Sequence, residues 1–436
     1  MTLIVRLRQG MRAYWQPLSL QTRQLSHVWP AGSRVNEAGR LEIGGCDAIE
    51  LAREFGTPAY IVAEDDLRAR ARSFVTAFAE RHTGETELLF ASKAFPCTAV
   101  YRVLAEEGIG VDVASGGELA SALRAGFEPG RVVVHGNAKS EAELTAALQA
   151  RVGTIVIDGS DELDRLSRLV DRPQRVYLRV TPNVRGETHD GISTGQADSK
   201  FGVELVDAPA LIERIEAHPL LDMRGLHMHI GSQIRDLAPF RRAVRAVAHL
   251  GDFAEIDLGG GLGVAYTEDM DVPTIEQYAD AKIGVVQEQY GSDIRIVDEP
   301  GRALVANSCV TLYTVETIKR NVSTWVAVDG GMSDNLRPML YGARYEAQVA
   351  DRFGDNTPCH LVGKHCESSD VIVRDAQLAD PKVGDVVVTP VTGAYGFSMA
   401  NNYNGIPRPP VVFCKDGDAR VVVRRETYDD LFHRDV

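Results

Sequence analysis

The sequence predicts an α/β protein with two domains, a (β/α)8 barrel of the TIM type and a β-rich second domain of the sandwich or barrel kind. Two observations carry this prediction. Between residues 88 and 298, eight short β-branched runs alternate with amphipathic segments, and eight such units are the number that closes a barrel. Beyond about residue 306, strand-like runs follow one another with turns between them and no helix-length segment. An open, doubly wound sheet is the alternative for the first part.

The expected barrel strands are short runs rich in β-branched residues, at 88–92, 110–114, 131–135, 154–158, 175–180, 224–229, 254–258 and 294–298. The expected helices lie between them, with one more before the first strand, at 64–80, 98–107, 117–126, 140–150, 161–170, 208–218, 238–250 and 274–290. Gly108 and Gly126 close two of these helices, as glycine commonly does. Strands that alternate with helices in this way pair in parallel through right-handed crossovers.

The β-rich domain is expected from runs at 311–319, 324–328, 360–362, 371–373, 385–390, 411–413 and 419–424, separated by Gly, Pro, Asp and Asn. The first 45 or so residues contain no strong helix pattern and are expected to add strands to this domain. We therefore predict a barrel over residues 48–305. Residues 1–47 and 306–436 are predicted to form the second domain, which contributes substrate-binding and dimer-interface residues.

Charge and cysteine content exclude several classes of protein. The chain of 436 residues has 47 basic and 61 acidic residues, a formal net charge of −14, so nucleic acid and anionic membranes are poor candidates for partners. Its six cysteines form no C-x-x-C pair, which argues against a disulfide scaffold and a zinc ribbon. We find no signal-peptide pattern and no apolar run near 18 residues, and we expect a cytoplasmic protein.

Polar residues stand where the expected barrel strands end, and the carboxyl end of a barrel carries its active site. The first strand ends in Lys93; a lysine in an apolar mouth has a lowered pKa and can attack carbonyls, although a surface lysine is the commoner situation. Later strands end in Asp112, in 135–137, in Arg179 and in Glu299. Such a series is hard to explain as structural accident.

The seventh strand runs into four glycines within five residues, at 259, 260, 261 and 263. Their unobstructed N–H groups can bind phosphate, and barrels often bind phosphate after strands seven and eight, where Arg302 adds a positive charge. A tight strand-to-helix turn is the alternative. Of the histidines 227 and 229, we expect one to face the site and the other to pack on the opposite side, and we favour His229 as the functional one. No metal site and no serine hydrolase site is expected.

A lysine for an imine, a phosphate-binding loop, a histidine that can stack on a ring (His229) and a carboxylate (Glu299) together predict a pyridoxal 5'-phosphate site. Glu299 would keep the pyridine nitrogen protonated. Each signal is weak alone, but their order along the barrel makes the combination specific.

These residues lie in longer motifs that resemble the diaminopimelate decarboxylase family, a branch of the fold-type III pyridoxal-phosphate enzymes related to alanine racemase and ornithine decarboxylase. The resemblance extends from about Val28 to Asp429. The motifs are the segments 91–94, 112–119, 135–140, 227–234, 259–263, 299–302, 337–343, 366–368 and 393–400. The last three are the most specific to this family.

The resemblance implies a role for each matching residue. Lys93 matches the lysine that holds the cofactor covalently, His229 the histidine that stacks on its ring, and Glu299 the partner of its pyridine nitrogen, with Asp112 and Arg179 as supporting residues. The matching phosphate pocket comprises Ser232, Gly259, Gly260, Gly261 and Arg302, with Pro300 and Gly301 in the same motif. Arg337 and Tyr341, with Arg302, match the residues that bind the distal carboxylate of the substrate. Tyr395 matches a tyrosine shared by cofactor and substrate.

Two further residues are implied to act across a homodimer. Cys366 resembles the proton donor and Glu367 the acceptor for the distal ammonium group, and in this family both reach the active site of the partner subunit. Read without the resemblance, Cys366 would more commonly be a small buried residue. The implied reaction converts meso-2,6-diaminopimelate to L-lysine and CO2, the last step of lysine biosynthesis.

Three alternatives differ from this interpretation at named residues. A decarboxylase for ornithine or arginine should lack the Arg337 and Tyr341 pair, a racemase normally has arginine in place of Glu299, and a non-catalytic relative should have lost Lys93 or Cys366. The chain departs from the commoner family motifs at Ser92 and Phe95, at Ser369, where Gly is usual, and at Tyr345, where His is common. These departures leave the named chemical groups in place.

Overall fold

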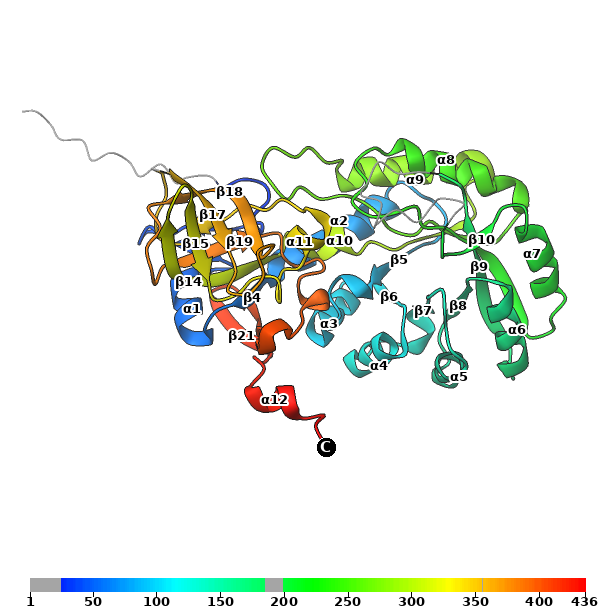
Figure 1. Cartoon of the computed structure of the whole chain (residues 1–436). Helices are drawn as coiled ribbons and strands as arrows, with labels where there is room; N and C mark the ends of the chain where they lie inside the picture. The colour runs from blue at the N-terminus through cyan, green and yellow to red at the C-terminus, as the bar shows by residue number, and fades with distance from the viewer. Residues whose placement is uncertain (1–24, 185–198, 355) are drawn as a thin grey trace, which may run out of the picture.

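The computed structural model describes residues 25–184, 199–354 and 356–436, which form a barrel and a β-rich domain lying next to each other (Figure 1). In the described chain, eight parallel strands form the barrel. They are β5 (Thr86–Ala91), β6 (Gly110–Val113), β7 (Val132–Val134), β8 (Thr154–Ile157), β9 (Gln174–Thr181), β11 (Leu221–His227), β12 (Glu255–Asp257) and β13 (Arg295–Asp298). The last strand, β13, pairs with the first, β5, so the sheet is closed, and the open-sheet alternative is excluded. A short strand, β10 (Val203–Glu204), extends the sheet beside β9.

Helices surround the barrel, as Figure 1 shows. They are α2 (Glu64–Ala79), α3 (Thr98–Glu106), α4 (Gly116–Ala125), α5 (Glu141–Ala150), α6 (Ser160–Leu169), α7 (Ala208–Glu216), α8 (Ala238–Val247), α9 (Ile275–Tyr290) and the short α10 (Arg302–Val305). Ser140 and Thr274 begin α5 and α9 with capping boxes, and Gly126 ends α4 in a left-handed conformation. Inside the barrel, one buried cluster is contributed by five strands: Leu89, Val133, Val156, Tyr177 and Val297.

The β-rich domain is built on a mixed sheet in the order β18-β17-β15-β14-β4-β20-β21, to which β19 and β16 are attached through β14. The strands from the C-terminal part are β14 (Cys309–Arg320), β15 (Thr324–Val328), β16 (Gln348–Val349), β17 (Asn356–Val362), β18 (Val371–Ala379), β19 (Val386–Pro390), β20 (Val411–Lys415) and β21 (Asp418–Val423). Two short helices, α11 (Arg337–Tyr341) and α12 (Tyr428–Phe432), accompany them. The expected β-rich character is thus observed.

The amino-terminal segment belongs with this domain over a longer stretch than the sequence suggested. It contains β1 (Arg34–Val35), β2 (Leu41–Ile43) and β3 (Cys46–Asp47), which form a separate three-stranded sheet, followed by α1 (Ala48–Phe55) and β4 (Ala59–Ala63). Strand β4 pairs with β14 on one side and with β20 on the other. We therefore propose that the barrel domain begins at Glu64 and not at residue 48. Residues 1–24 of the predicted 1–47 segment lie outside the described residues.

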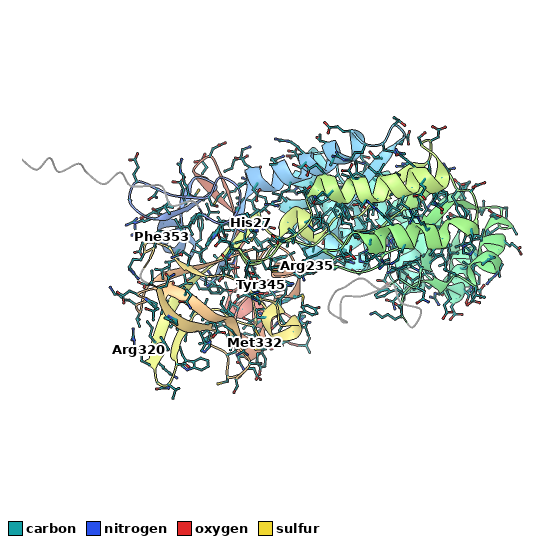
Figure 2. The ribbon with its side chains drawn as sticks, turned by 90° about the horizontal axis from the view of Figure 1, so that it is seen from above. His27, Arg235, Arg320, Met332, Tyr345 and Phe353 are labelled. Carbon is teal, nitrogen blue, oxygen red and sulfur yellow. The ribbon has the colours of Figure 1, made fainter. Side chains whose placement is uncertain are left out.

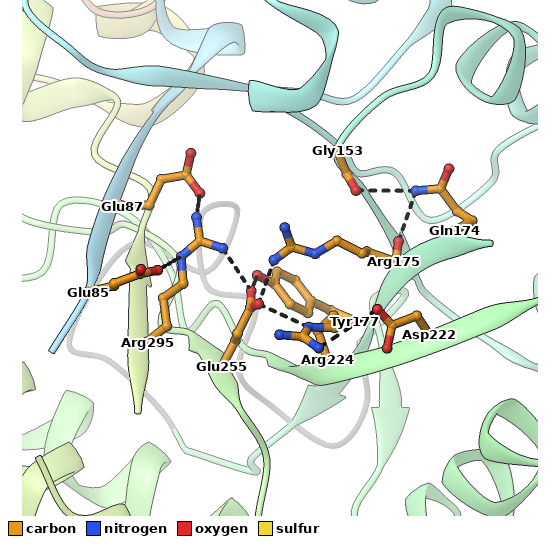
Figure 3. Close-up of polar contacts among 10 residues, drawn as sticks. All are labelled: Glu85, Glu87, Gly153, Gln174, Arg175, Tyr177, Asp222, Arg224, Glu255 and Arg295. Atoms are coloured by element: carbon orange, nitrogen blue, oxygen red, sulfur yellow. Dashed lines mark hydrogen bonds and ion pairs between the residues drawn. The ribbon is translucent and has the colours of Figure 1, made fainter. Parts of the chain in front are cut away.

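At the amino-terminal end of the barrel strands, Glu255 forms ion pairs with three arginines (Figure 3). Its carboxylate lies 2.5 Å from Arg175, 3.1 Å from Arg224 and 3.3 Å from Arg295, and it accepts a hydrogen bond from Tyr177 at 2.5 Å. These residues start or border the strands β9, β11, β12 and β13. In barrels this end serves stability, whereas the opposite end carries the chemistry.

No helix in the described chain is both long enough and apolar enough to cross a bilayer.

Candidate active site

A cavity of about 470 Å³ opens at the carboxyl end of the barrel strands. Almost all of the predicted cofactor residues line it. They are Lys93, Asp112, His229, Ser232, Gly260, Gly261, Glu299, Pro300, Gly301, Arg302 and Tyr395, joined by Ala91, Leu262 and Ala303. Residues from both domains therefore converge on one cavity.

Lys93 stands on a 3-10 turn (Ser92–Ala94) that directly follows β5. Its side chain is exposed, whereas those of its neighbours Ser92 and Ala94 are buried and fix the turn. The backbone N–H of Tyr395, from the β-rich domain, donates to the carbonyl of Ala94 at 2.9 Å. The amine is thus presented at the cavity wall by a turn that both domains hold.

Glu299 follows β13 and is 6% exposed. The Nε2 atoms of His135 and His227 lie 2.5 Å and 3.2 Å from its two carboxylate oxygens. Burial alone would raise the pKa of Glu299, but the two histidines outweigh this effect and hold the pKa well below its usual range. Glu299 is therefore an ionised carboxylate at neutral pH.

The expectation that His227 packs on the opposite side is wrong. Residues two apart in a strand point to the same face, so His227 and His229 both face inward. His227 contacts Glu299, and burial lowers its pKa to about 3, which makes it a neutral donor to that carboxylate. His229 lines the cavity, where burial and the charges of Lys93 and Arg179 hold its pKa well below the ordinary value. Its neutral ring suits stacking on an aromatic cofactor.

Asp257 completes a buried group with His135, His227 and Glu299, whose ligand-type atoms all lie within 4.8 Å of one another. No metal site was expected, and this group was not predicted, because its members come from the ends of four different strands. Burial and the charge of Glu299 raise the pKa of Asp257 well above its usual value, and its carboxyl accepts the N–H of Gly259 at 2.9 Å. We interpret the group as the environment that keeps Glu299 charged, since both histidines already face that carboxylate.

Asp112 and Arg179 lie near the same carboxylate. Burial and then the charge of Glu299 raise the pKa of Asp112 well above its usual value. Arg179 is buried, with its guanidinium 3.5 Å from Asp158 and 4.5 Å from the centre of the Phe201 ring. The supporting roles that the resemblance implies for the two residues stay a prediction.

The glycine loop after β12 is packed so closely that side chains cannot be accommodated. A Cβ on Gly260 would lie 2.1 Å from the carbonyl oxygen of Glu299, and Gly261, with φ +127°, would meet the carbonyl of Gly231 at 2.7 Å. From behind, the buried Lys282 donates to the carbonyl of Gly259 at 2.7 Å. Gly259 itself is next to the cavity wall, which Gly260 and Gly261 form.

Arg302 gives this wall a positive charge. It donates to the hydroxyl of Ser232 at 2.9 Å, and its guanidinium lies 4.9 Å from the ring centre of Tyr395. None of the described carboxylates forms an ion pair with Arg302, which is 4% exposed. A buried arginine without a carboxylate partner among the described residues, a serine and a glycine loop that exposes backbone to the cavity fit a phosphate. Together with Lys93, His229 and Glu299, these residues fit pyridoxal 5'-phosphate.

Arg337 begins α11, in the β-rich domain, and is 4% exposed. It donates to the hydroxyl of Tyr345 at 2.5 Å and lies over the ring of Tyr266 at 4.4 Å. Burial would lower the pKa of Arg337, but the two tyrosines raise it, so the side chain is charged. Among the described residues it has no carboxylate partner, which suits an anionic ligand. Tyr341 lies half-buried at the end of α11.

Sequence reasoning did not assign roles to Tyr266 and Tyr345. Tyr345 had been noted only as a departure from the commoner His, yet it is the hydrogen-bond partner of Arg337, and Figure 2 places it at the junction of the two domains. The rings of Tyr266 and Tyr345 meet edge to face at 5.2 Å. The position of Tyr266 shortly after the glycine loop is the feature of the sequence that could have indicated its place near the site.

Cys366 and Glu367 do not line this cavity, and both are exposed. Cys366 is the only exposed one of the six cysteines, all of which lie in described segments and are free thiols. The alternative of a buried Cys366 is therefore excluded. A hollow of about 1750 Å³ lies beside the same region, between the segment 338–347 and β18, and Ser369 is part of its lining.

Comparison with known proteins agrees with this geometry. Residues 64–306 match the family model described as the pyridoxal-binding domain of pyridoxal-dependent decarboxylases. The diaminopimelate decarboxylase of Actinosynnema pretiosum subsp. auranticum is 45% identical over 94% of this chain and 95% of its own length. That of Bacillus subtilis is 44% identical over 93% and 97%.

The chain belongs to the diaminopimelate decarboxylase family.

Solved structures of family members share the whole fold. The structure of diaminopimelate decarboxylase from M. jannaschii in complex with L-lysine has a TM-score of 0.88 and 34% identity, covering 93% of this chain and 98% of that one. A lysine/ornithine decarboxylase from Vibrio vulnificus, with a TM-score of 0.73 and 22% identity over 84% of this chain and 97% of that one, shares the fold. The family's pyridoxal-binding domain corresponds to the barrel, and its boundary at residue 64 agrees with the end of β4.

Proposed function

We propose that this protein catalyses the pyridoxal 5'-phosphate-dependent decarboxylation of meso-2,6-diaminopimelate to L-lysine and CO2, the last step of lysine biosynthesis. The observation that carries the proposal is the cavity lined by Lys93 and Glu299, together with the buried Arg337 beside it. Arg337 lies over the ring of Tyr266, whose hydroxyl accepts a hydrogen bond from Arg302 on the cavity wall, and it has no carboxylate partner among the described residues. Lys93 and Glu299 suit a pyridoxal-phosphate decarboxylase in general. Arg337 selects the substrate, because it requires an anionic group there.

The cofactor, when bound, supplies an electron-accepting ring that stabilises negative charge on the carbon that loses its carboxylate. Lys93 provides the amine that holds the cofactor, and the ionised Glu299 favours a protonated ring nitrogen. His229 supports the flat ring, and Ser232 with Arg302 and the glycine loop binds the phosphate. Each role uses a residue on the wall of one cavity.

Substrate selection follows from charge. The charged guanidinium of Arg337 binds the distal carboxylate of diaminopimelate, with Tyr341 as the second predicted contact. Ornithine and lysine offer only an ammonium group at that end and would leave a buried cation unpaired. A site of this kind rejects the wrong ligand by several orders of magnitude.

We further propose a head-to-tail homodimer in which the partner subunit's Cys366 donates a proton to the α-carbon and the partner subunit's Glu367 accepts the distal ammonium. Two observations support this. Both residues are exposed on their own subunit and lie outside its cavity. The hollow beside Tyr345 includes Ser369 of the same turn in its lining, so this face offers room for a second chain. The six free thiols fit the cytoplasmic location that we propose.

The substrate is tested by measuring CO2 release from meso-diaminopimelate, ornithine, arginine and lysine with the cofactor-loaded protein. We expect release from meso-diaminopimelate alone. Activity confined to ornithine or arginine would overturn the proposal. The variant R337M should lower kcat/KM for meso-diaminopimelate by at least about 100-fold, in line with the loss of a charge-assisted pair.

The lysine and the shared sites need separate tests. Borohydride reduction of the loaded protein should label Lys93, and Lys93→Ala should abolish the adduct; a surviving adduct would identify another lysine. Mixed dimers of Lys93→Ala and Cys366→Ala subunits should regain activity at one of their two sites. Mixed dimers as inactive as the two parents would mean that the sites are not shared.

A further inference from the structure

We propose that Asp370 is a positioning residue for two active sites at once, holding Arg337 in its own subunit's site and Cys366 in the partner's site. This inference rests on the proposed function, which places Cys366 in the partner's site. Its basis is a single buried carboxylate, 3% exposed, whose two oxygens hold two different turns. One turn carries Cys366 and Glu367, and the other leads into Arg337.

The first oxygen fixes the turn that carries Cys366. Oδ2 of Asp370 accepts the backbone N–H of His365 at 3.0 Å and lies 2.7 Å from Nδ1 of the same residue. The turn closes on itself, because Glu367 N–H donates to the carbonyl of His365 at 2.8 Å and Asp370 N–H to that of Glu367 at 3.1 Å. His365 is buried while Cys366 is exposed, so the anchored residue lies directly before the reactive one.

A neighbouring segment supports the same turn from its other side. The ring of Tyr403 stacks on that of His365 at 5.8 Å, with an angle of 5° between the planes. The side-chain oxygen of Asn404 accepts the backbone N–H of Cys366 at 3.0 Å. The direction in which Cys366 and Glu367 leave the surface is thus fixed by contacts on both sides of the turn.

The second oxygen of Asp370 fixes the turn that leads to Arg337. Oδ1 accepts the backbone N–H of Met332 at 2.8 Å, and Figure 2 locates Met332 on the β-rich domain. The following Asp334 closes this turn by accepting the N–H of Gly331 at 2.7 Å. Helix α11 starts three residues later, at Arg337. A shift of Met332 would therefore move the start of α11.

Two glycines allow both turns to touch the carboxylate. A Cβ on Gly331, with φ +148°, would lie 2.5 Å from Oδ2 of Asp370, and a Cβ on Gly363 would lie 2.1 Å from it. The two turns are therefore in direct contact with one rigid group and cannot shift independently of it. Because an amide has only one acceptor oxygen and no charge, Asp370→Asn removes the acceptor of one turn and weakens the hydrogen bonds to the other.

Mixed dimers separate the two roles. The parent pair combines a Lys93→Ala subunit with a Cys366→Ala subunit, so one working site remains. In the first arrangement, Asp370→Asn is added to the Lys93→Ala subunit, which supplies only Cys366 and Glu367 to the working site. In the second, it is added to the Cys366→Ala subunit, which supplies Lys93 and Arg337.

We expect the first arrangement to lower kcat by about tenfold with KM within about twofold of the parent pair, since proton donation is disturbed. The second should raise KM by about tenfold, since the site of the distal carboxylate is disturbed. Parameters equal to those of the parent pair in both arrangements, or the same loss in both, would overturn the inference. An inactive parent pair would instead refute the shared site itself.

Two further variants guard against a general loss of structure. His365→Leu removes the contact of the ring with Oδ2 and its stacking on Tyr403, both of which support only the turn of Cys366. It should reproduce the first arrangement but not the second; an equal effect in both would count against the inference. Asp380→Asn alters a carboxylate whose side chain is 66% exposed, just beyond β18, and should match the parent pair in both arrangements. All mixed dimers should have the thermal unfolding midpoint of the parent pair to within a few degrees.

Discussion

Arg337 and Tyr345 form a buried pair in which the guanidinium donates to the phenol oxygen at 2.5 Å. The pair joins the start of α11 to the loop between α11 and β16, and the ring of Tyr266 lies under the guanidinium. The Nε atom of Arg337 has no hydrogen-bond partner among the described residues. The pair thus holds the arginine while leaving part of its hydrogen-bonding capacity for a ligand.

This relationship predicts that Tyr345→Phe raises KM for meso-diaminopimelate by about fivefold to tenfold, the cost of one lost hydrogen bond. The value of kcat should change by less than about threefold, because Tyr345 touches Arg337 and not the reacting carbon. Steady-state kinetics measures both constants. Tyr345→His, which restores an acceptor, should keep KM within about threefold. An unchanged KM in Tyr345→Phe would show that the pair does not orient Arg337.

The buried histidine beside Glu299 predicts how stability depends on pH. Burial lowers the pKa of His227 to about 3, whereas an unfolded histidine titrates near about 6.5. Between these values the unfolded chain binds a proton that the native protein does not, so stability falls as pH falls, by up to about 1.4 kcal/mol per pH unit.

The thermal unfolding midpoint, measured from pH 7.5 to 5, should therefore fall less steeply for His227→Gln than for the wild type. The exposed His249 provides the control, and His249→Gln should keep the wild-type slope. Equal slopes for all three proteins would contradict the assignment of a neutral His227.

Behind the phosphate loop, Lys282 predicts a loss of cofactor affinity on substitution. Its ammonium donates to the carbonyls of Leu258 at 3.1 Å and Gly259 at 2.7 Å and pairs with Asp298. Lys282→Met removes this anchor and should raise the Kd for pyridoxal 5'-phosphate by about tenfold or more in a spectrophotometric titration of the apoprotein.

Lys282→Met also leaves the Asp298 carboxylate unpaired, which destabilises the protein for a different reason. The double variant with Asp298→Asn removes that charge. It should recover most of the lost thermal stability but keep the weak cofactor binding. Recovery of both properties would show that the buried charge, and not the loop anchor, caused the loss.

The arginine cluster at the amino-terminal end of the barrel predicts a stability effect without a catalytic one (Figure 3). Glu255→Gln leaves three arginines facing a neutral group and should lower the unfolding free energy by about 2–4 kcal/mol, seen as a lower thermal midpoint. Because the cluster is at the end opposite the cavity, kcat/KM should stay within about twofold. Glu85→Gln changes a carboxylate that is 84% exposed and should have almost no effect. A large change in kcat/KM for Glu255→Gln would contradict this division of roles.

Much of the barrel was predictable because its signal is local. Every expected strand from 88–92 to 294–298 overlaps an observed one. The signals that predict a strand, namely the pattern of apolar residues and the turn-forming residues at its ends, each extend over only a few positions. Strand β4 was not recognised as part of the β-rich domain. Its run Ala59–Ala63 resembles a barrel strand, and its partners β14 and β20 are distant in the sequence.

The active site was predictable to the extent that one rule applies, because the carboxyl ends of parallel strands meet at one face. This rule places Lys93, Asp112, His229 and Glu299 around one cavity. His227 was misassigned although strand periodicity was sufficient to place it on the inner face.

The roles of three further residues could not be predicted from local sequence patterns. Lys282 looks like a surface residue of an amphipathic helix, and the contacts of Tyr345 and Asp370 exist only after distant segments have packed together. Their roles follow from tertiary contacts that no run or spacing in the sequence reveals.

The position of β4 fixes the order in which the chain can fold as it is synthesised. The last barrel strand ends at Asp298, whereas β4 needs β14, which starts at Cys309, and β20, which starts at Val411. The barrel can therefore close while the amino-terminal strand still has both edges unpaired, and the β-rich domain waits until translation is nearly complete. A nascent chain that stalls before Val411 would expose an aggregation-prone strand edge beside a finished barrel.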